Sequence, residues 1–295
     1  MPTSLPVPYQ LVPGRLRLAA SRVLVGSGAA ARFTPALAFA KDDEAPPAIA
    51  APSWPGAACA ALALTHDIDT RRGLAQVEAL LDIEERAGVR STLFLPGELA
   101  DRFADRVRGW QTRGFEVGLH DVRHDNRLAD LIESRLAARV ARIGAAARAF
   151  GMRGFRAPSL RIREETIGEL PVPLRYDSSL PSYRPAFRST PARGSRTCRP
   201  FRIGRVWELS ASLPFDDDLL RWGHSFDEFP AILGSWVNAV AARGGVAVYA
   251  DHLEPHLSGS DAGRAAYRRF LERHRTGGSL WVATLGEVVR FLTNE

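Results

Sequence analysis

Short apolar runs alternate with longer amphipathic stretches along most of this chain, and this alternation limits its fold more than any other feature of the sequence. From Ala57 onward, each apolar run is followed by polar residues and then by apolar residues at helical spacing. Strands that alternate with helices are typical of a parallel sheet covered by helices. The chain has 295 residues, of which 45% are hydrophobic, so it can bury one sizeable core.

The apolar runs predict strands over residues 58–64, 91–95, 115–119, 154–156, 174–176, 206–209, 246–249 and 280–283. The clearest helical patterns cover residues 74–86, 128–150, 226–243 and 261–275. Such a number of strand–helix units is typical of a closed sheet. The predicted fold class is therefore α/β, a distorted (β/α) barrel of seven or eight strands.

Residues 1–55 have a different composition from the rest of the chain. They are rich in proline, alanine and arginine, show no sustained period, and end in the proline-rich segments 45–47 and 52–55. Such composition is typical of a linker. We predict an N-terminal extension over residues 1–55 and one catalytic domain over residues 56–295.

The location of the protein is predicted from its apolar segments and its cysteines. Arg17 and Arg22 interrupt the apolar stretch 16–25, so this segment does not have the clean apolar run of a secretory signal. No run of about eighteen apolar residues is present that could span a membrane. Cys59 and Cys198 are too few for a disulfide framework or a cysteine zinc site. We expect a cytoplasmic protein with reduced thiols.

The net charge of +6 comes almost wholly from arginine. No basic run is interleaved with aromatic residues and no nucleic-acid-binding module is present, so nucleic acid is not an expected partner. The arginines of the extension support a separate hypothesis of peripheral contact with anionic membranes. These arginines are Arg15, Arg17, Arg22 and Arg32. The sequence carries no signal for an oligomeric state.

Polar residues of unusual type follow the predicted strands. They are Asp67 and Asp69 after the first strand, His120 after the third, Arg156 after the fourth, Asp177 after the fifth and His252 after the seventh. In parallel barrels the loops at the carboxyl ends of the strands form the active site. These residues are therefore the candidates for catalysis.

Asp67 and Asp69 are two positions apart, so both point to the same side if the extended conformation continues beyond the strand. An alternative is that one aspartate caps a helix starting near Arg71 while the other is solvated. The two aspartates therefore indicate a metal site only when they are considered together with the histidines.

His120 and His124 are four positions apart and would lie on one face of a helical turn. With Asp69 they offer two imidazoles and a carboxylate, a ligand set that suits a first-row transition metal. Three protein ligands leave positions open for water and substrate. We expect Zn²⁺ here, with Co²⁺, Ni²⁺ or Fe²⁺ as alternatives.

Arg156 and His252 complete the set of candidates. A guanidinium at the barrel mouth can hold a nearby carboxylate in its ionised form, although an ordinary structural ion pair explains Arg156 as well. A strand-end histidine near a metal can act as a general acid, and either His252 or His256 fits this role. Several carboxylates could orient this histidine. They are Asp251, Glu208, Asp216, Asp217 and Asp218.

Five short motifs follow the predicted strands in order: THDIDT at 65–70, HDVRH at 120–124, RAP at 156–158, YDSS at 176–179 and HL at 252–253. Together they resemble the motifs of the NodB-type polysaccharide deacetylases, also called carbohydrate esterase family four. The resemblance covers residues 57–295. The first motif looks like a variant in which one residue separates the two aspartates. The implied fold is a distorted barrel of seven or eight strands.

The resemblance implies a role for each motif. Asp67 would be the general base and His252 the general acid, with Arg156 as a third catalytic residue. The metal ligands would be Asp69, His120 and His124. Asp177 and Pro158 would contact the substrate. The implied activity is that of a metal-dependent hydrolase that removes an acyl group, expected to be N-acetyl, from an amino sugar in a polysaccharide or glycan precursor.

Three alternatives to this activity are open. The same fold could act on a small or lipid-linked amide or formamide, or it could bind sugar without catalysis. A third alternative is a zinc peptidase, because HDVRH is similar to the HExxH motif with aspartate in place of glutamate. That motif lies inside a long helix, whereas His120 directly follows a predicted strand, which disfavours a peptidase.

Overall fold

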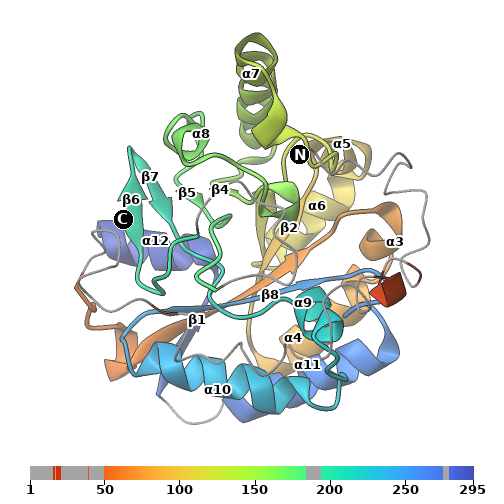
Figure 1. Ribbon diagram of the computed structural model, residues 1–295, viewed down its shortest axis with the longest axis vertical. Helices are drawn as coiled ribbons and strands as arrows, with labels where there is room; N and C mark the ends of the chain where they lie inside the picture. Colours follow the sequence, from red (N-terminus) through yellow and green to blue (C-terminus); the bar gives the residue numbers. More distant parts are fainter. Residues whose placement is uncertain (1–15, 17, 21–38, 40–49, 184–193, 275–278) are drawn as a thin grey trace.

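The computed structural model describes residues 16, 18–20, 39, 50–183, 194–274 and 279–295 (Figure 1). Nine strands within these ranges form one sheet in the order β6-β7-β5-β4-β3-β2-β1-β8, with β9 paired to β1. Their bounds are β1 Ala60–Asp67, β2 Thr92–Leu95, β3 Glu116–Leu119, β4 Gly154–Phe155, β5 Tyr176–Asp177, β6 Phe201–Ile203, β7 Val206–Glu208, β8 Val246–His252 and β9 Leu280–Ala283.

Eight of these strands run parallel and curl into a barrel. β1 pairs with β8 along its length, with β9 near its start and with β2 near its end. The sheet is closed irregularly between β7 and β8, where the Leu213 amide donates to the Val248 carbonyl at 3.2 Å and the Val248 amide donates to Ser212 Oγ at 2.8 Å. The predicted distorted barrel is therefore confirmed. β6 is the exception, since it pairs antiparallel with β7.

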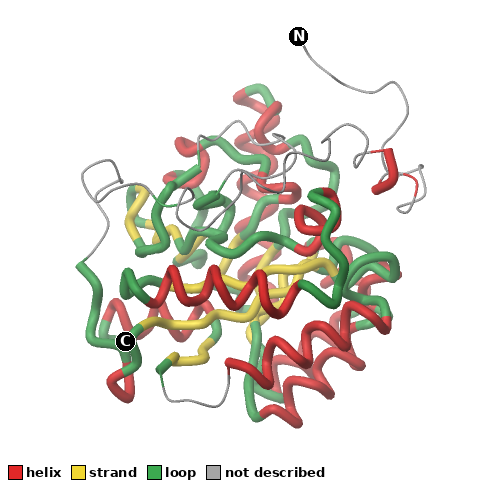
Figure 2. The backbone as a smooth tube through the Cα atoms, turned by 60° about the horizontal axis from the view of Figure 1, so that its bottom comes forward, coloured by secondary structure: helices red, strands yellow, loops and turns green. Residues whose placement is uncertain are grey.

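Helices surround the strands on both sides (Figure 2). Their bounds are α3 Arg71–Leu74, α4 Val77–Ala87, α5 Gly97–Arg102, α6 Ala104–Thr112, α7 Glu133–Phe150, α8 Glu164–Gly168, α9 Asp216–Arg221, α10 Phe229–Ala241, α11 Asp261–His274 and α12 Leu285–Thr293. In Figure 1, α4, α10 and α11 lie together beside β1 and β8, and α7 lies at the opposite side of the sheet. Short 3₁₀ turns cover Pro55–Ala57, Leu128–Asp130 and Pro158–Leu160.

Several predicted boundaries are corrected by the structure. The predicted helix 74–86 is two helices, α3 and α4, and the predicted helix 128–150 begins with a 3₁₀ turn before α7. The strand predictions missed β6, which is a short edge strand with its central Arg202 exposed. The four helical patterns bounded from the sequence do not include α5, α6, α8, α9 and α12, of which α5, α8 and α9 have six residues or fewer. Such short elements have too few turns to show a helical period.

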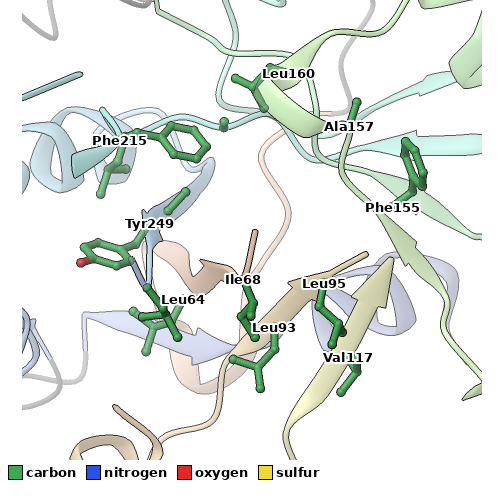
Figure 3. Packing of buried hydrophobic residues seen from close by; sticks show 14 of the residues in the cluster. Leu64, Ile68, Leu93, Leu95, Val117, Phe155, Ala157, Leu160, Phe215 and Tyr249 are labelled. Carbon is green, nitrogen blue, oxygen red and sulfur yellow. The ribbon is translucent and has the colours of Figure 1, made fainter. Parts of the chain in front are cut away.

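The strands separate two apolar cores, because successive side chains point to opposite faces. Ala61, Ala63, Phe94, Val246 and Val248 lie in a cluster inside the barrel. The alternate residues pack outward against the helices in a larger cluster that includes Leu64, Ile68, Leu93, Leu95 and Val117 (Figure 3). On β1 the odd-numbered residues therefore face the interior and the even-numbered residues face the helices.

The amino-terminal end of the barrel is closed by α12. The Leu285 amide donates to Thr92 Oγ1 at 3.1 Å and the Gly286 amide donates to Glu116 Oε2 at 2.8 Å, at the starts of β2 and β3. Val288 and Val289 of this helix belong to the inner core. The carboxyl-terminal end of the barrel is where the candidate residues gather.

The predicted extension contributes a few described residues. Trp54 is buried and lies against the Trp281 and Phe291 rings in tilted arrangements, with centroids 5.9 and 5.5 Å away. Its indole nitrogen donates to the Gly244 carbonyl. The basic residues Arg15, Arg17, Arg22 and Arg32 lie outside the described residues. The domain division at residue 55 stays a prediction. No helix in the described ranges has the length and apolar character needed to cross a membrane, and no disulfide joins Cys59 to Cys198.

Candidate metal centre

β1 places Asp67 and Asp69 at the barrel mouth. The strand extends to Asp67, three residues beyond the predicted end at residue 64, because Thr65 to Asp67 pair with both β2 and β8. Asp67 occupies an odd position and faces the interior. The chain stays tied to β2 beyond the strand, since the Ile68 amide donates to the Phe94 carbonyl at 2.8 Å. Asp69 follows on the same side, as the two-residue spacing predicts.

His120 and His124 come from the loop after β3. The His120 Nδ1 atom lies 2.8 Å from the Arg156 carbonyl, which requires Nδ1 to carry the proton and leaves Nε2 available as a ligand atom. Residues 121–127 form bends instead of the helical turn considered from the sequence, and Asp121 has a φ of 60°. The two imidazoles still meet, with ring centroids 5.2 Å apart. The absence of a helix in this described segment also disfavours the peptidase alternative.

Asp69, His120 and His124 form a compact triangle of ligand atoms. Asp69 Oδ1 lies 3.4 Å from His120 Nε2 and 3.3 Å from His124 Nε2, and all three atoms lie within 4.8 Å of one another. Asp69 Oδ1 is buried and accepts no hydrogen bond from any described residue. A buried carboxylate oxygen facing two imidazole nitrogens without a hydrogen bond is the arrangement expected of metal ligands. The residues present therefore fit a divalent transition metal.

The pKa of Asp69 reflects this environment. Burial favours the neutral acid, but the proximity of the His124 and His120 rings outweighs it and holds the pKa of Asp69 well below its usual range. An ionised carboxylate is the form that binds a cation.

Arg156 fixes Asp67 beside this triangle. Its Nη1 atom donates to Asp67 Oδ1 at 2.9 Å and to Thr65 Oγ1 at 2.8 Å. Its Nε and Nη2 atoms donate to the carbonyl and the hydroxyl of Ser178, both at 3.0 Å. The guanidinium lies over the Phe94 ring, 4.4 Å from its centroid. The second oxygen of Asp67 points toward His120, with Oδ2 4.0 Å from Nε2.

His252 reaches the site from the end of β8. Its Nδ1 atom donates to Asp216 Oδ1 at 2.8 Å, and Asp217 lies 4.0 Å away. Burial lowers the pKa of His252, but Asp216 and Asp217 outweigh it and raise this pKa well above the usual value of 6.5. Because His252 is paired in register with Asp67, this histidine, the first of the two considered, lies at the same end of the barrel as the ligand triangle.

The carboxylate that orients His252 is thus Asp216, at the start of α9. The alternative Asp251 occupies the outward-facing position of β8 and contacts His66 instead, with Oδ1 2.6 Å from Nδ1. Glu208 is also excluded, because it lies beside Asp177 on the neighbouring strands β5 and β7. The three consecutive aspartates at 216–218 could be recognised in the sequence as candidate partners of His252. Only the fold shows that Asp216 is the one that contacts it.

Asp177 and Pro158 lie close to the site but are buried. The Asp177 carboxylate accepts from the Ser179 amide at 2.9 Å and from the Ser179 hydroxyl at 2.8 Å. The Ser179 hydroxyl accepts in turn from the Ala157 amide at 2.8 Å, which ties Asp177 to the chain between Arg156 and Pro158. The predicted substrate contacts of Asp177 and Pro158 stay a prediction.

The curled parallel barrel and the Asp–His–His triangle at its mouth define a (β/α)-barrel protein with an enzyme-like candidate metal centre. Residues 57–170 match the family model described as polysaccharide deacetylase. The resemblance seen in the sequence is therefore confirmed over this segment, and the matched family is one of deacetylases. The matched segment contains Asp67, Asp69, His120, His124 and Arg156, whereas His252 lies beyond it.

The fold is also similar to that of several solved structures. A structure named for a polysaccharide deacetylase from Mycobacterium smegmatis has a TM-score of 0.68 at 23% identity and covers 85% of this chain and 96% of its own. One named for a polysaccharide deacetylase from Pseudomonas aeruginosa PAO1 has a TM-score of 0.61 at 17% identity, with 85% and 95% covered. The structure named Puue allantoinase has a TM-score of 0.62 at 16% identity, with the same coverage. At these identities the likeness concerns the fold. No curated protein matches the chain.

Proposed function

We propose that this protein is a metal-dependent hydrolase that removes an acyl group, expected to be N-acetyl, from an amino sugar in a polysaccharide or glycan precursor. The observation that carries the proposal is the buried Asp69 Oδ1, which faces His120 Nε2 and His124 Nε2 without a hydrogen bond from any described residue. The match of residues 57–170 to the polysaccharide deacetylase family supports the substrate class.

The proposed metal ligands are Asp69, His120 and His124, and Zn²⁺ is the expected ion, with Co²⁺, Ni²⁺ or Fe²⁺ as alternatives. When bound, such an ion lowers the pKa of a water molecule and polarises an acyl carbonyl. The ligand set of one carboxylate and two imidazoles leaves coordination positions for both, as a catalytic site requires.

Asp67 is the proposed general base. Arg156 and its partners hold Oδ1, so the carboxylate cannot rotate freely, and Oδ2 is the oxygen directed toward the ligand triangle. In the proposed reaction Oδ2 accepts the proton of the attacking water. General base catalysis by a positioned carboxylate contributes about 10² to 10⁴ in rate.

His252 is the proposed general acid. Its Nδ1–H group donates a hydrogen bond to Asp216, so Nε2 is the atom that gives a proton to the leaving amine in the proposed reaction. The raised pKa of His252, caused by Asp216 and Asp217 against the effect of burial, keeps this proton on the ring at neutral pH. The acid and the base sit side by side on β8 and β1, because Asp67 and His252 are paired in register.

The proposed partner is therefore an amino-sugar or glycan substrate. A structural relative is named an allantoinase, so a small amide is the second substrate to test. Contact with anionic membranes through the arginines of residues 1–32 remains a separate proposal. It predicts stronger binding to anionic than to neutral vesicles, and equal binding to both would contradict it.

The decisive experiment measures metal content and acetate release together. The wild-type protein, Asp69→Ala and Asp67→Asn are purified, their metal is quantified by elemental analysis, and each is assayed on N-acetylglucosamine oligomers. We expect about one metal per chain in the wild type, loss of metal in Asp69→Ala, and retained metal with loss of acetate release in Asp67→Asn. Metal without acetate release in the wild type would move the assay to formyl groups, lipid-linked sugars and allantoin. A wild type that binds no metal would overturn the proposal.

A further inference from the structure

The loop that carries His120 and His124 is held by an arginine from another element. Arg139 lies in α7, and its side chain is only 10% exposed. Its Nη1 atom donates to Asp121 Oδ2 at 3.3 Å, and its Nη2 atom donates to Asp125 Oδ2. One guanidinium thus bridges the two carboxylates that immediately follow the two histidines.

This loop has little regular structure of its own. Residues 121–127 contain bends, and Asp121 and Asn126 adopt left-handed conformations with φ of 60° and 58°. On one side, the loop carbonyls accept hydrogen bonds from the start of α5. The Gly97 amide donates to the Asp121 carbonyl, and the Glu98 amide donates to the Val122 carbonyl, both at 2.9 Å. Arg139 holds the loop through its carboxylates from α7.

The charges explain why an arginine is suited to this position. Asp121 is buried, with 1% of its side chain exposed, and Asp125 is 24% exposed. Without a cation between them the two carboxylates repel, and a buried unpaired carboxylate is costly. A planar guanidinium can bond two carboxylates at the same time, whereas the single ammonium of lysine holds a less defined geometry.

We propose that Arg139 is a positioning residue for the metal centre. It sets the conformation of residues 121–125 so that the Nε2 atoms of His120 and His124 converge on Asp69 before any ion binds. This inference rests on the proposed metal-dependent function, and it adds a residue from outside the ligand motifs. Both bonds of Arg139 go to loop carboxylates instead of to ligands, so its effect on the ion is indirect.

The test compares metal affinity in Arg139→Met with that in Arg142→Met. Methionine keeps the apolar stem of Arg139 and removes its bonds. Arg142 lies on the same helix, is half exposed and contacts Glu98, so it is the matched control. Affinity for Zn²⁺ is measured by competition with a chromophoric chelator, and the Co²⁺ form is examined by its visible absorption bands. We expect Arg139→Met to bind about 10 to 100 times more weakly than the wild type, and Arg142→Met to bind as the wild type does.

A merely structural role gives a different result. In that case Arg139→Met would lower the melting temperature of the metal-free protein but leave the Zn²⁺ affinity and the Co²⁺ spectrum unchanged, and this outcome would overturn the inference. A wild type that fails to bind Zn²⁺ or Co²⁺ would instead overturn the proposed function.

A second pair of variants covers the case in which Arg139→Met does not fold. Asp125→Asn removes the charge of the more exposed carboxylate, and Arg139→Lys keeps the charge but loses the bridge. We expect both to weaken Zn²⁺ binding, by less than Arg139→Met does. Wild-type affinity in both of these variants would also overturn the inference.

Discussion

The role of each residue on β1 and β8 depends on whether its position is odd or even. Asp67 and His252 face the barrel mouth, whereas their neighbours His66 and Asp251 face the helices. A strand alternates its side chains with a period of two, so a shift of one residue would exchange the catalytic candidates for a buried ion pair. The register between the two strands therefore sets both the active site and the packing behind it.

Arg156 is expected to contribute to rate without contributing to metal binding. In Arg156→Lys the ammonium cannot replace the four hydrogen bonds to Thr65, Asp67 and Ser178, so Asp67 loses its fixed orientation. We predict that kcat falls by roughly 10- to 100-fold while the metal content is unchanged. Arg106→Lys, at an exposed pair with Glu78, is the control. Unchanged turnover in Arg156→Lys would contradict the assigned role.

The pH dependence of the reaction should report His252. The acid acts in its protonated form, so kcat/KM falls as the pH rises through the pKa of His252, which Asp216 and Asp217 raise well above 6.5 against burial. Asp216→Asn removes the nearest negative charge and lowers this pKa. We predict that the alkaline limb of the kcat/KM profile moves to lower pH by about one to two units. An alkaline limb in the same place would show that another group donates the proton.

At the level of elements, a buried polar network joins β1, β8, α4 and α11 behind the site. His66 lies between Asp251, at 2.6 Å, and Glu84, at 2.8 Å. Tyr249 donates to Asp251 at 2.7 Å, and Tyr267 donates to Glu84 at 2.5 Å. Burial lowers the pKa of His66, but the two carboxylates outweigh it and raise the pKa to about 10. His66 is therefore a charged group inside the outer core.

This network predicts how stability depends on pH. The pKa of His66 is higher in the folded state than its unfolded value of 6.5, so its contribution is complete below about pH 6.5 and is lost as the pH rises toward 10. His66→Ala leaves two buried carboxylates without their cation. We predict a loss of roughly 3–5 kcal/mol in the free energy of unfolding at pH 6, measured by urea denaturation, and a smaller loss at pH 9. A loss that is equal at both pH values would contradict a charged His66.

The glycine of β3 is required by the packing under Arg156. A Cβ atom at Gly118 would lie 2.5 Å from the Phe94 ring, and this ring supports the Arg156 guanidinium. We predict that Gly118→Ala destabilises the fold by about 1–3 kcal/mol in urea denaturation and also lowers kcat. A Cβ atom at Gly109, in α6, would meet no atom of the described residues within 4 Å, so Gly109→Ala should be neutral or slightly stabilising. Equal stability of the two variants would contradict this account.

For the whole molecule, the candidate site depends on closing the barrel. Its residues come from β1, β8, α9 and the segments that follow β1, β3 and β4, and β1 and α9 are separated by about half of the chain. The proposed metal would therefore link the end of β1 and the loop after β3, which only the folded state brings together. Binding to such a site stabilises the folded state by mass action.

Metal removal should consequently lower the melting temperature. Zn²⁺ at a hundred times its Kd adds about 2.7 kcal/mol to the free energy of unfolding, which corresponds to a rise of roughly 5–10 °C. We predict this rise for the wild type by calorimetry, its reversal by a chelator, and no rise in Asp69→Ala. A rise of the same size in Asp69→Ala would place the ion elsewhere.

The sequence by itself determined the barrel class and most of the candidate ligand set. The order of strands and helices can be read from the sequence. A strand buried on both faces is a continuous apolar run, and a helix buried on one face has apolar residues at helical spacing. The spacing of Asp67 and Asp69 and of His120 and His124 was likewise visible, since ligands on one loop or strand end are close in sequence.

The tertiary structure decided what depends on distant contacts. Asp216 is the partner of His252 because α9 begins beside the end of β8, and the neighbouring acids Asp217 and Asp251 had equal claims in sequence. His120 and His124 converge through a bent loop held by Arg139, and no local period marks a bend. Asp69 is proposed as a metal ligand, instead of a helix cap, because the fold buries its Oδ1 against two imidazoles. Such choices rest on burial and electrostatics between segments far apart in the chain, which only the folded barrel brings together.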